Sequence, residues 1–80
     1  MPKLPVVSGA EFAKALLKLR FKVTNRRGDH VVLTLRENDP STALTVPLHK
    51  ELKKGTLSSL LKRTEEIAGV SRDELVDLIR

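Results

Sequence analysis

Two short alternating stretches separated by a glycine-containing turn constrain the fold of this chain more than any other feature. In residues 21–26, Phe21 and Val23 share one side and polar residues take the other, and residues 30–36 repeat the alternation. Successive side chains of a strand point to opposite faces, so each stretch predicts a half-buried strand. Only Arg27-Gly28-Asp29 separates them, which predicts an antiparallel hairpin.

A helical pattern precedes this hairpin, and a third strand follows it. Ser8 and Glu11 have the spacing of a capping box, and apolar residues then recur at i, i+4 and i+7, which predicts a helix over about residues 9–19. Residues 43–46 predict a short strand, which Pro47 ends.

Two more helices are expected in the last third of the chain. Apolar residues from Leu57 onward recur at helical spacing until Gly69, a residue type that commonly ends helices. Ser71 and Glu74 then form a second candidate capping box in front of a short helix.

The elements follow one another in the order α-β-β-β-α-α, which predicts an α+β fold. A three-stranded antiparallel sheet with the helices on one face would bury the apolar sides of all of them. A chain of 80 residues predicts one domain, spanning residues 1–80. The other face of the sheet should be wet. Six residues of the first two strands are expected on it: Lys22, Thr24, Arg26, His30, Thr34 and Arg36.

The charge of the chain is basic and unevenly distributed. Residues 1–63 hold 13 basic and 5 acidic groups, a net of +8, whereas residues 64–80 hold 2 basic and 5 acidic groups, a net of −3. Such a split suggests a polyanion-binding body, with nucleic acid as one candidate partner, and a neutralising C-terminal segment; the plain alternative is a generic charged surface. Phe12 and Phe21 are the only aromatic residues, too few for the base-stacking platforms of RRM-like or OB-like single-strand binders.

Several other classes of protein lack support in the sequence. The chain has no cysteine, no apolar run of the roughly 18 residues that a membrane span needs, and no stretch typical of a signal peptide. We therefore expect a cytoplasmic protein that does not bind a membrane. The two histidines and the scattered carboxylates show no metal-ligand spacing, and no cofactor motif is present, so neither a metal nor a cofactor is expected.

His30 is the candidate catalytic residue. It follows a glycine-containing turn and is expected on the wet face, among cations. RNA carries its own nucleophile, the 2′-hydroxyl, so an imidazole that takes its proton and cations that stabilise the phosphorane would cleave RNA without a metal. The plain alternative is a surface histidine without a role. Asp29 is expected to point away from His30 and to cap an amide of the turn.

The remaining candidates are residues that could bind the phosphates of a substrate. His49 could form an acid–base pair with His30, but a simple phosphate contact is the favoured interpretation. Lys53 and Lys54 precede a helix whose first amides could bind phosphate, or they form a solvated connector. The full candidate set is Lys22, Arg26, Arg27, Gly28, His49, Lys50, Lys53 and Lys54.

Two motifs of the chain resemble the HicA/YcfA-like toxin family. Gly28-Asp29-His30 opens the second strand, and residues 46–57 contain a strand ending in Val-Pro, a histidine, a basic stretch and Gly-Thr-Leu. The resemblance runs from about Val7 to the C-terminus. It implies a double-stranded-RNA-binding-like fold and a ribosome-independent mRNA endonuclease, the toxin of a type II toxin–antitoxin pair. It also implies a HicB-like antitoxin that blocks the active surface.

The resemblance also maps the essential histidine of the family onto His30, and Asp29 stands where typical members carry a serine. The predicted function is thus an endoribonuclease toxin in which His30 is the general acid/base. Two alternatives from other classes remain: a non-catalytic RNA-binding module, and a protein-interaction module whose basic face fits an acidic partner.

Overall fold

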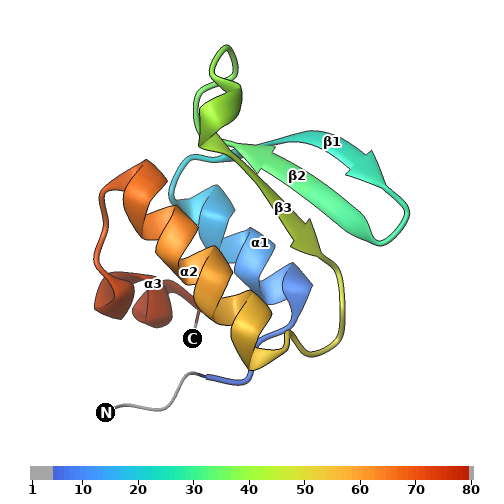
Figure 1. Ribbon diagram of the computed structural model, residues 1–80, viewed down its shortest axis with the longest axis vertical. Helices are drawn as coiled ribbons and strands as arrows, with labels where there is room; N and C mark the ends of the chain where they lie inside the picture. Colours follow the sequence, from blue (N-terminus) through green and yellow to red (C-terminus); the bar gives the residue numbers. More distant parts are fainter. Residues whose placement is uncertain (1–4, 80) are drawn as a thin grey trace.

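Two of three helices pack against one face of a three-stranded antiparallel sheet in the computed structural model, which describes residues 5–79, and the third helix packs on those two (Figure 1). The α+β class and the order α-β-β-β-α-α are confirmed. The sheet has the strand order β1-β2-β3. The elements are α1 (Gly9–Lys18), β1 (Lys22–Arg27), β2 (His30–Thr34), a 3-10 helix (Pro40–Thr42), β3 (Ala43–Pro47), α2 (Lys54–Ala68) and α3 (Arg72–Ile79).

Helix α1 begins with the predicted capping box. The Ser8 hydroxyl accepts a hydrogen bond from the Glu11 amide at 3.0 Å, and the Glu11 carboxylate accepts one from the Ser8 amide at 2.9 Å. Hydrogen bonding of the Glu11 carboxylate to the Ser8 backbone, and secondly to the Ser8 side chain, lowers the pKa of Glu11 below its ordinary value. Phe12 and Leu16 lie one turn apart and are both buried under the sheet.

Strand β1 departs from simple alternation. Its register against β2 shifts between Val23 and Asn25, which makes the intervening residue part of a β-bulge. After the bulge Arg26 pairs with Val31, a core residue, and not with an outward-facing position. Directly paired residues share a face, so Arg26 lies on the helix side of the sheet. The prediction that Arg26 shares the wet face with His30 was wrong, because the extra residue of a bulge reverses the alternation.

Three other residues that were predicted to lie in the first two strands differ in burial or location from the prediction. Thr34 is buried, with 5% of its surface exposed, and its hydroxyl lies 2.8 Å from that of Thr24. Strand β2 ends at Thr34, so Arg36 lies in the following loop, where its amide donates to the Thr42 hydroxyl. Val23 is half exposed, because all of β1 lies at an exposed edge of the sheet.

The core lies between the sheet and the helices. Among residues 5–79, fifteen apolar residues are buried in it, contributed by all three helices, by β2 and β3, and by the connecting segments. Gly69 ends α2 with a φ of +68°, the left-handed conformation that glycine adopts without steric cost. The Ser71 hydroxyl accepts from the Glu74 amide at 3.2 Å, which confirms it as the residue that caps α3.

Helix α3 forms a separate layer next to α1 and α2. It packs across α1 and α2 on the side of the helices that faces away from the sheet (Figure 1). Leu75 and Ile79 of α3 are buried there. Within residues 5–79, no helix combines the length and the apolar character that crossing a bilayer requires.

Candidate active site

The hairpin turn between β1 and β2 is the centre of the candidate site. Arg27 pairs directly with His30, which leaves Gly28 and Asp29 as a two-residue loop. Gly28 has a φ of +51°, so a residue with a Cβ would be strained there. The same pairing places the side chains of Arg27 and His30 on one face, the outer face of the sheet.

Asp29 and His30 form a close pair within this turn. Oδ1 of Asp29 lies 2.8 Å from Nδ1 of His30, a hydrogen-bond distance. The prediction that Asp29 points away from His30 was wrong. Strand alternation does not apply to Asp29, because it belongs to the loop and not to β2. Both side chains remain about half exposed, 65% for Asp29 and 51% for His30, so a substrate can reach them.

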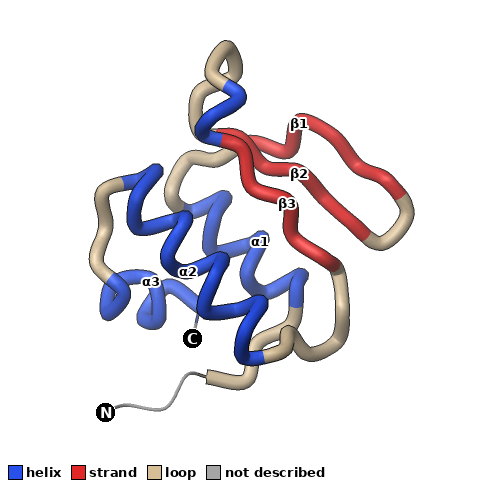
Figure 2. The backbone as a smooth tube through the Cα atoms, viewed as in Figure 1, coloured by secondary structure: helices blue, strands red, loops and turns tan. Residues whose placement is uncertain are grey.

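The loop from β3 to α2 brings the second histidine to the same turn. Figure 2 shows this loop leaving the end of β3 and running to the start of α2. Three backbone hydrogen bonds hold it. The Leu48 amide donates to the Asp29 carbonyl at 2.6 Å. The Gly9 amide donates to the His49 carbonyl at 2.9 Å, and the Leu52 amide donates to the Val7 carbonyl at 2.7 Å. The loop is thereby tied both to the hairpin turn and to the start of α1.

His49 lies beside both Asp29 and His30 as a result. Its Nε2 is 3.8 Å from Oδ2 of Asp29, and the two imidazole rings lie 6.5 Å apart at their centres with an angle of 71° between their planes. The sequence left the distance between the histidines open. The structure places them on either side of one carboxylate, with His49 also about half exposed.

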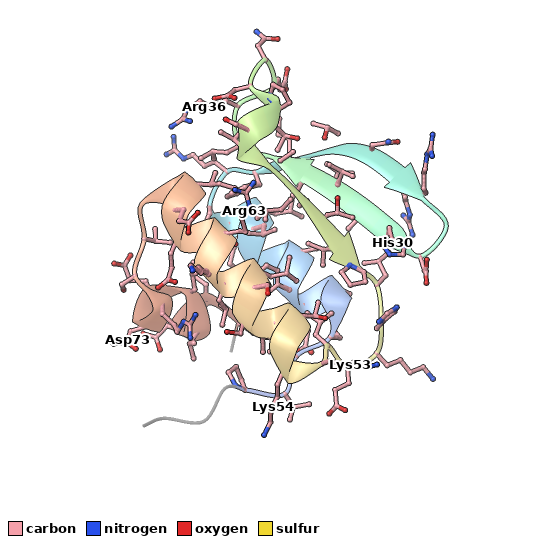
Figure 3. The ribbon with its side chains drawn as sticks, in the orientation of Figure 1. His30, Arg36, Lys53, Lys54, Arg63 and Asp73 are labelled. Atoms are coloured by element: carbon pink, nitrogen blue, oxygen red, sulfur yellow. The ribbon has the colours of Figure 1, made fainter. Side chains whose placement is uncertain are left out.

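This arrangement defines the hydrogen-bonding roles of His30. A neutral imidazole carries one proton, and a carboxylate 2.8 Å from Nδ1 can only accept, so the proton belongs on Nδ1. The lone pair of Nε2 is then free to accept a proton from a substrate. Figure 3 shows His30 at the end of the sheet beside the turn, and not among the side chains that cover the helices.

Four of the candidate phosphate-binding residues lie around this pair. Arg27 ends β1 and Gly28 follows it in the turn. His49 lies across from His30, and Lys50 follows His49 as an exposed residue of the same loop. The carboxylate of Asp29 lies in the same site as the positively charged side chains of Arg27 and Lys50.

The other four candidates lie elsewhere. Lys22 pairs with Thr34 at the opposite end of β1, about 15 Å along the strand, and its Nζ lies 3.0 Å from a carboxylate oxygen of Glu37. Arg26 lines an open groove on the α1 side of the sheet. Figure 3 shows Lys53 and Lys54 at the start of α2, away from His30. The structure therefore does not gather the whole predicted set on one surface.

Metal-binding groups do not cluster in the described part of the chain. In residues 5–79, no group of three or more histidine and carboxylate side chains is placed to hold a metal ion.

Comparison with known proteins gives one match. The sequence matches the family model described as HicA toxin of bacterial toxin–antitoxin systems over residues 9–65, which is 57 of the 80 residues. The matched segment includes the hairpin turn and the loop that carries His49. No curated protein and no solved structure matches the chain. The match covers well over half of the sequence, and the chain therefore belongs to the HicA toxin family of bacterial toxin–antitoxin systems.

Proposed function

We propose that this toxin is an endoribonuclease that cleaves mRNA by attack of the RNA's own 2′-hydroxyl, with His30 as the general base. The observation that carries the proposal is the Asp29–His30 pair at 2.8 Å on the exposed hairpin turn. A carboxylate that fixes an imidazole in one tautomer is the arrangement that other hydrolytic sites use to prepare a base. Family membership supports RNA as the substrate.

The reaction begins with proton transfer to His30. Nε2 of His30 takes the proton of a 2′-hydroxyl, and the resulting oxygen attacks the adjacent phosphorus. The O2′–P bond forms, the P–O5′ bond breaks, and the products are a 2′,3′-cyclic phosphate and a 5′-hydroxyl. No external nucleophile is required, because the ribose supplies it.

The cations of the site would bind the substrate's phosphates and stabilise the phosphorane. Arg27, which is in register with His30, and Lys50, which follows His49, would bind the phosphates around the scissile bond. Arginine presents a planar set of donors that fits phosphate oxygens in pairs, so Arg27 is the residue that would stabilise the charge of the phosphorane.

The same surface suggests how the toxin is controlled. Family membership implies an antitoxin partner, and we propose that a HicB-like antitoxin covers the outer end of the hairpin, where the two histidines are exposed. Residues 1–80 would then act as a single RNA-cleaving domain that needs no cofactor.

The test is cleavage of RNA by the pure protein in the presence of EDTA. Wild type should produce fragments that end in 2′,3′-cyclic phosphate, and His30→Ala should reduce the rate by roughly 10²–10⁴, the usual contribution of a general base. Circular dichroism should show that both proteins are folded. EDTA-resistant cleavage by His30→Ala at the wild-type rate would refute the proposal.

A non-catalytic RNA-binding module is the second candidate, and the same experiment separates it. Such a module would bind RNA in a salt-dependent manner, because phosphate contacts release counterions, and wild type and His30→Ala would both leave the RNA intact. The exposed cations of the turn, Arg27 above all, are the feature that favours this candidate.

A further inference from the structure

The carboxylate of Asp29 has one oxygen directed toward each of two imidazoles. Oδ1 lies 2.8 Å from Nδ1 of His30 and Oδ2 lies 3.8 Å from Nε2 of His49. From this arrangement we infer that His49 is a second catalytic residue, the general acid that protonates the leaving 5′-oxygen, and that Asp29 is the positioning residue that joins the two histidines into one acid–base unit. The inference rests on the proposed RNA cleavage.

The spacing of the rings suits a single phosphodiester. In this reaction the attacking O2′ and the leaving O5′ are both bonded to one phosphorus, so the base and the acid have to reach two oxygens of the same group. Each catalytic group works at a hydrogen-bond distance of about 2.6–3.2 Å from its oxygen. Imidazoles whose centres are 6.5 Å apart and which are both about half exposed can contact the two oxygens together.

The two contacts of Asp29 assign different roles to the histidines. The short bond to His30 keeps a proton on Nδ1 and leaves Nε2 as the acceptor, which is the state that a base requires. The contact to His49 is beyond hydrogen-bond length, so it does not hold the ring in one orientation, but it gives a protonated His49 a carboxylate counter-charge 3.8 Å away. His49 is therefore placed to carry a proton and to release it to a substrate.

The backbone around His49 supports a catalytic position and not an incidental one. Its carbonyl accepts from the Gly9 amide, and the preceding amide, that of Leu48, donates to the Asp29 carbonyl. These bonds fix the Cα of His49 relative to the turn while the side chain stays about half exposed. A fixed backbone with an accessible ring lowers the cost of bringing the acid to its oxygen.

The proton balance of the reaction is then complete. His30 gains the proton of the 2′-hydroxyl as the O2′–P bond forms, and His49 loses a proton to O5′ as the P–O5′ bond breaks. The net charge of the pair is unchanged, and exchange with water restores both histidines after the products leave. Without an acid, O5′ would leave as an alkoxide, a far poorer leaving group.

A leaving group that needs no proton tests this assignment. We would first map a cleavage site with wild type on ordinary RNA, and then replace the bridging O5′ of that linkage with sulfur. A thiol has an ordinary pKa of about 8.5, so a thiolate departs without an acid. His49→Ala should cleave the oxygen linkage about 10²–10³ times more slowly than wild type, yet cleave the sulfur linkage within about 10-fold of it. His30→Ala should be slow on both substrates.

Two results would overturn the role of His49 while RNA cleavage itself stands. One is cleavage of the oxygen linkage by His49→Ala at the wild-type rate. The other is an equal loss on the oxygen and the sulfur linkage, which would give His49 a binding role only. His49→Gln, which keeps a polar side chain of similar reach, repeats the test if the alanine variant is unfolded by circular dichroism.

Failure of the proposed function gives a different pattern. If wild type cleaves neither substrate in EDTA, or if His30→Ala cleaves both at the wild-type rate, then RNA cleavage by His30 is wrong and the role of His49 falls with it. Loss of activity by His30→Ala together with full activity of His49→Ala on the oxygen linkage removes the second assignment alone.

Discussion

Replacing Gly9 by alanine should disrupt both the fold and the site, because there is no room for a side chain at this position. A Cβ on Gly9 would lie 1.9 Å from the carbonyl oxygen of Pro47 and 2.8 Å from the Cα of Leu48. Both are backbone atoms, so no rotation of a side chain can relieve the contact. Real Cβ atoms essentially never approach other heavy atoms within 3.0 Å, so α1 and the loop after β3 would have to separate by about 1 Å.

The cost of that separation has two parts. Overpacking of this kind destabilises a fold by about 1–3 kcal/mol. The movement also stretches the hydrogen bond from the Gly9 amide to the His49 carbonyl, now 2.9 Å, which adds about 1 kcal/mol. The free energy of unfolding should therefore fall by about 2–4 kcal/mol. For a domain of this size that corresponds to a fall of roughly 10–20 °C in the melting temperature.

Gly55→Ala provides a matched control for the assay. Gly55 lies in the first turn of α2, and nothing lies within 4 Å of the position that its Cβ would take. Alanine there should stabilise the protein by up to about 0.5–1 kcal/mol, since glycine in a helix is entropically costly. Urea unfolding followed by circular dichroism measures both variants. A Gly9→Ala protein within 0.5 kcal/mol of wild type would refute the close approach of α1 to the loop.

Four further variants test the electrostatics of the site and of α1. Asp29→Ala should lower kcat by about 10-fold, which is the scale of one hydrogen bond to a charged group, and should not raise KM. Steady-state cleavage kinetics measure both constants. An increase in KM with kcat unchanged would contradict the positioning role. Arg27→Ala should reduce the salt dependence of RNA binding by about one phosphate contact, whereas Lys22→Ala, which removes a cation paired with Glu37, should leave it unchanged; fluorescence anisotropy at several salt concentrations measures both. Glu11→Gln should lower the melting temperature more at pH 7 than at pH 3. The lowered pKa of Glu11 means that its carboxylate stabilises the fold above its ordinary pKa of 4.5, and that this stabilisation is lost as the pH falls through the lowered value. An equal difference in melting temperature at both pH values would contradict this assignment.

The helices and the order of the strands were predictable because local chemistry determines them. A serine three residues before a glutamate marked the start of α1, and Gly69 marked the end of α2. Each signal acts within one or two turns of the chain, so no knowledge of the tertiary structure is needed to interpret it.

The bulge in β1 was not predictable in the same way. After Val23 the strand contains only polar residues, so no apolar side chain marks the point at which the alternation reverses. The register is instead set by pairing with β2, where Val31 and Leu33 are buried. Arg26 was consequently assigned to the wrong face, while Arg27, the residue that does share the face of His30, had no strand pattern to support it.

The contact between His30 and His49 depends on the tertiary structure alone. The two residues are 19 positions apart, and their approach requires both the hairpin turn and the loop after β3, which Asp29 and Leu48 join through one backbone hydrogen bond. The role of Asp29 had a signal in the sequence that strand alternation obscured. A residue next to a turn glycine belongs to the loop, where its side chain can fold back on its neighbour.

A carboxylate in the proposed phosphate-binding site has an energetic cost and a benefit. An exposed negative charge about 4 Å from a phosphate costs about 1 kcal/mol in water, which weakens substrate binding by several-fold. A hydrogen bond from an imidazole to a carboxylate contributes about 1.5–3 kcal/mol, and this contribution grows when His30 becomes positively charged in the transition state. The Asp29–His30 bond is already present without substrate, so it does not offset the repulsion on binding, and only its strengthening in the transition state does. Asp29 would therefore weaken binding of the ground state and stabilise the transition state. A residue with this balance acts on kcat, which is why its removal is expected to slow cleavage without weakening the complex.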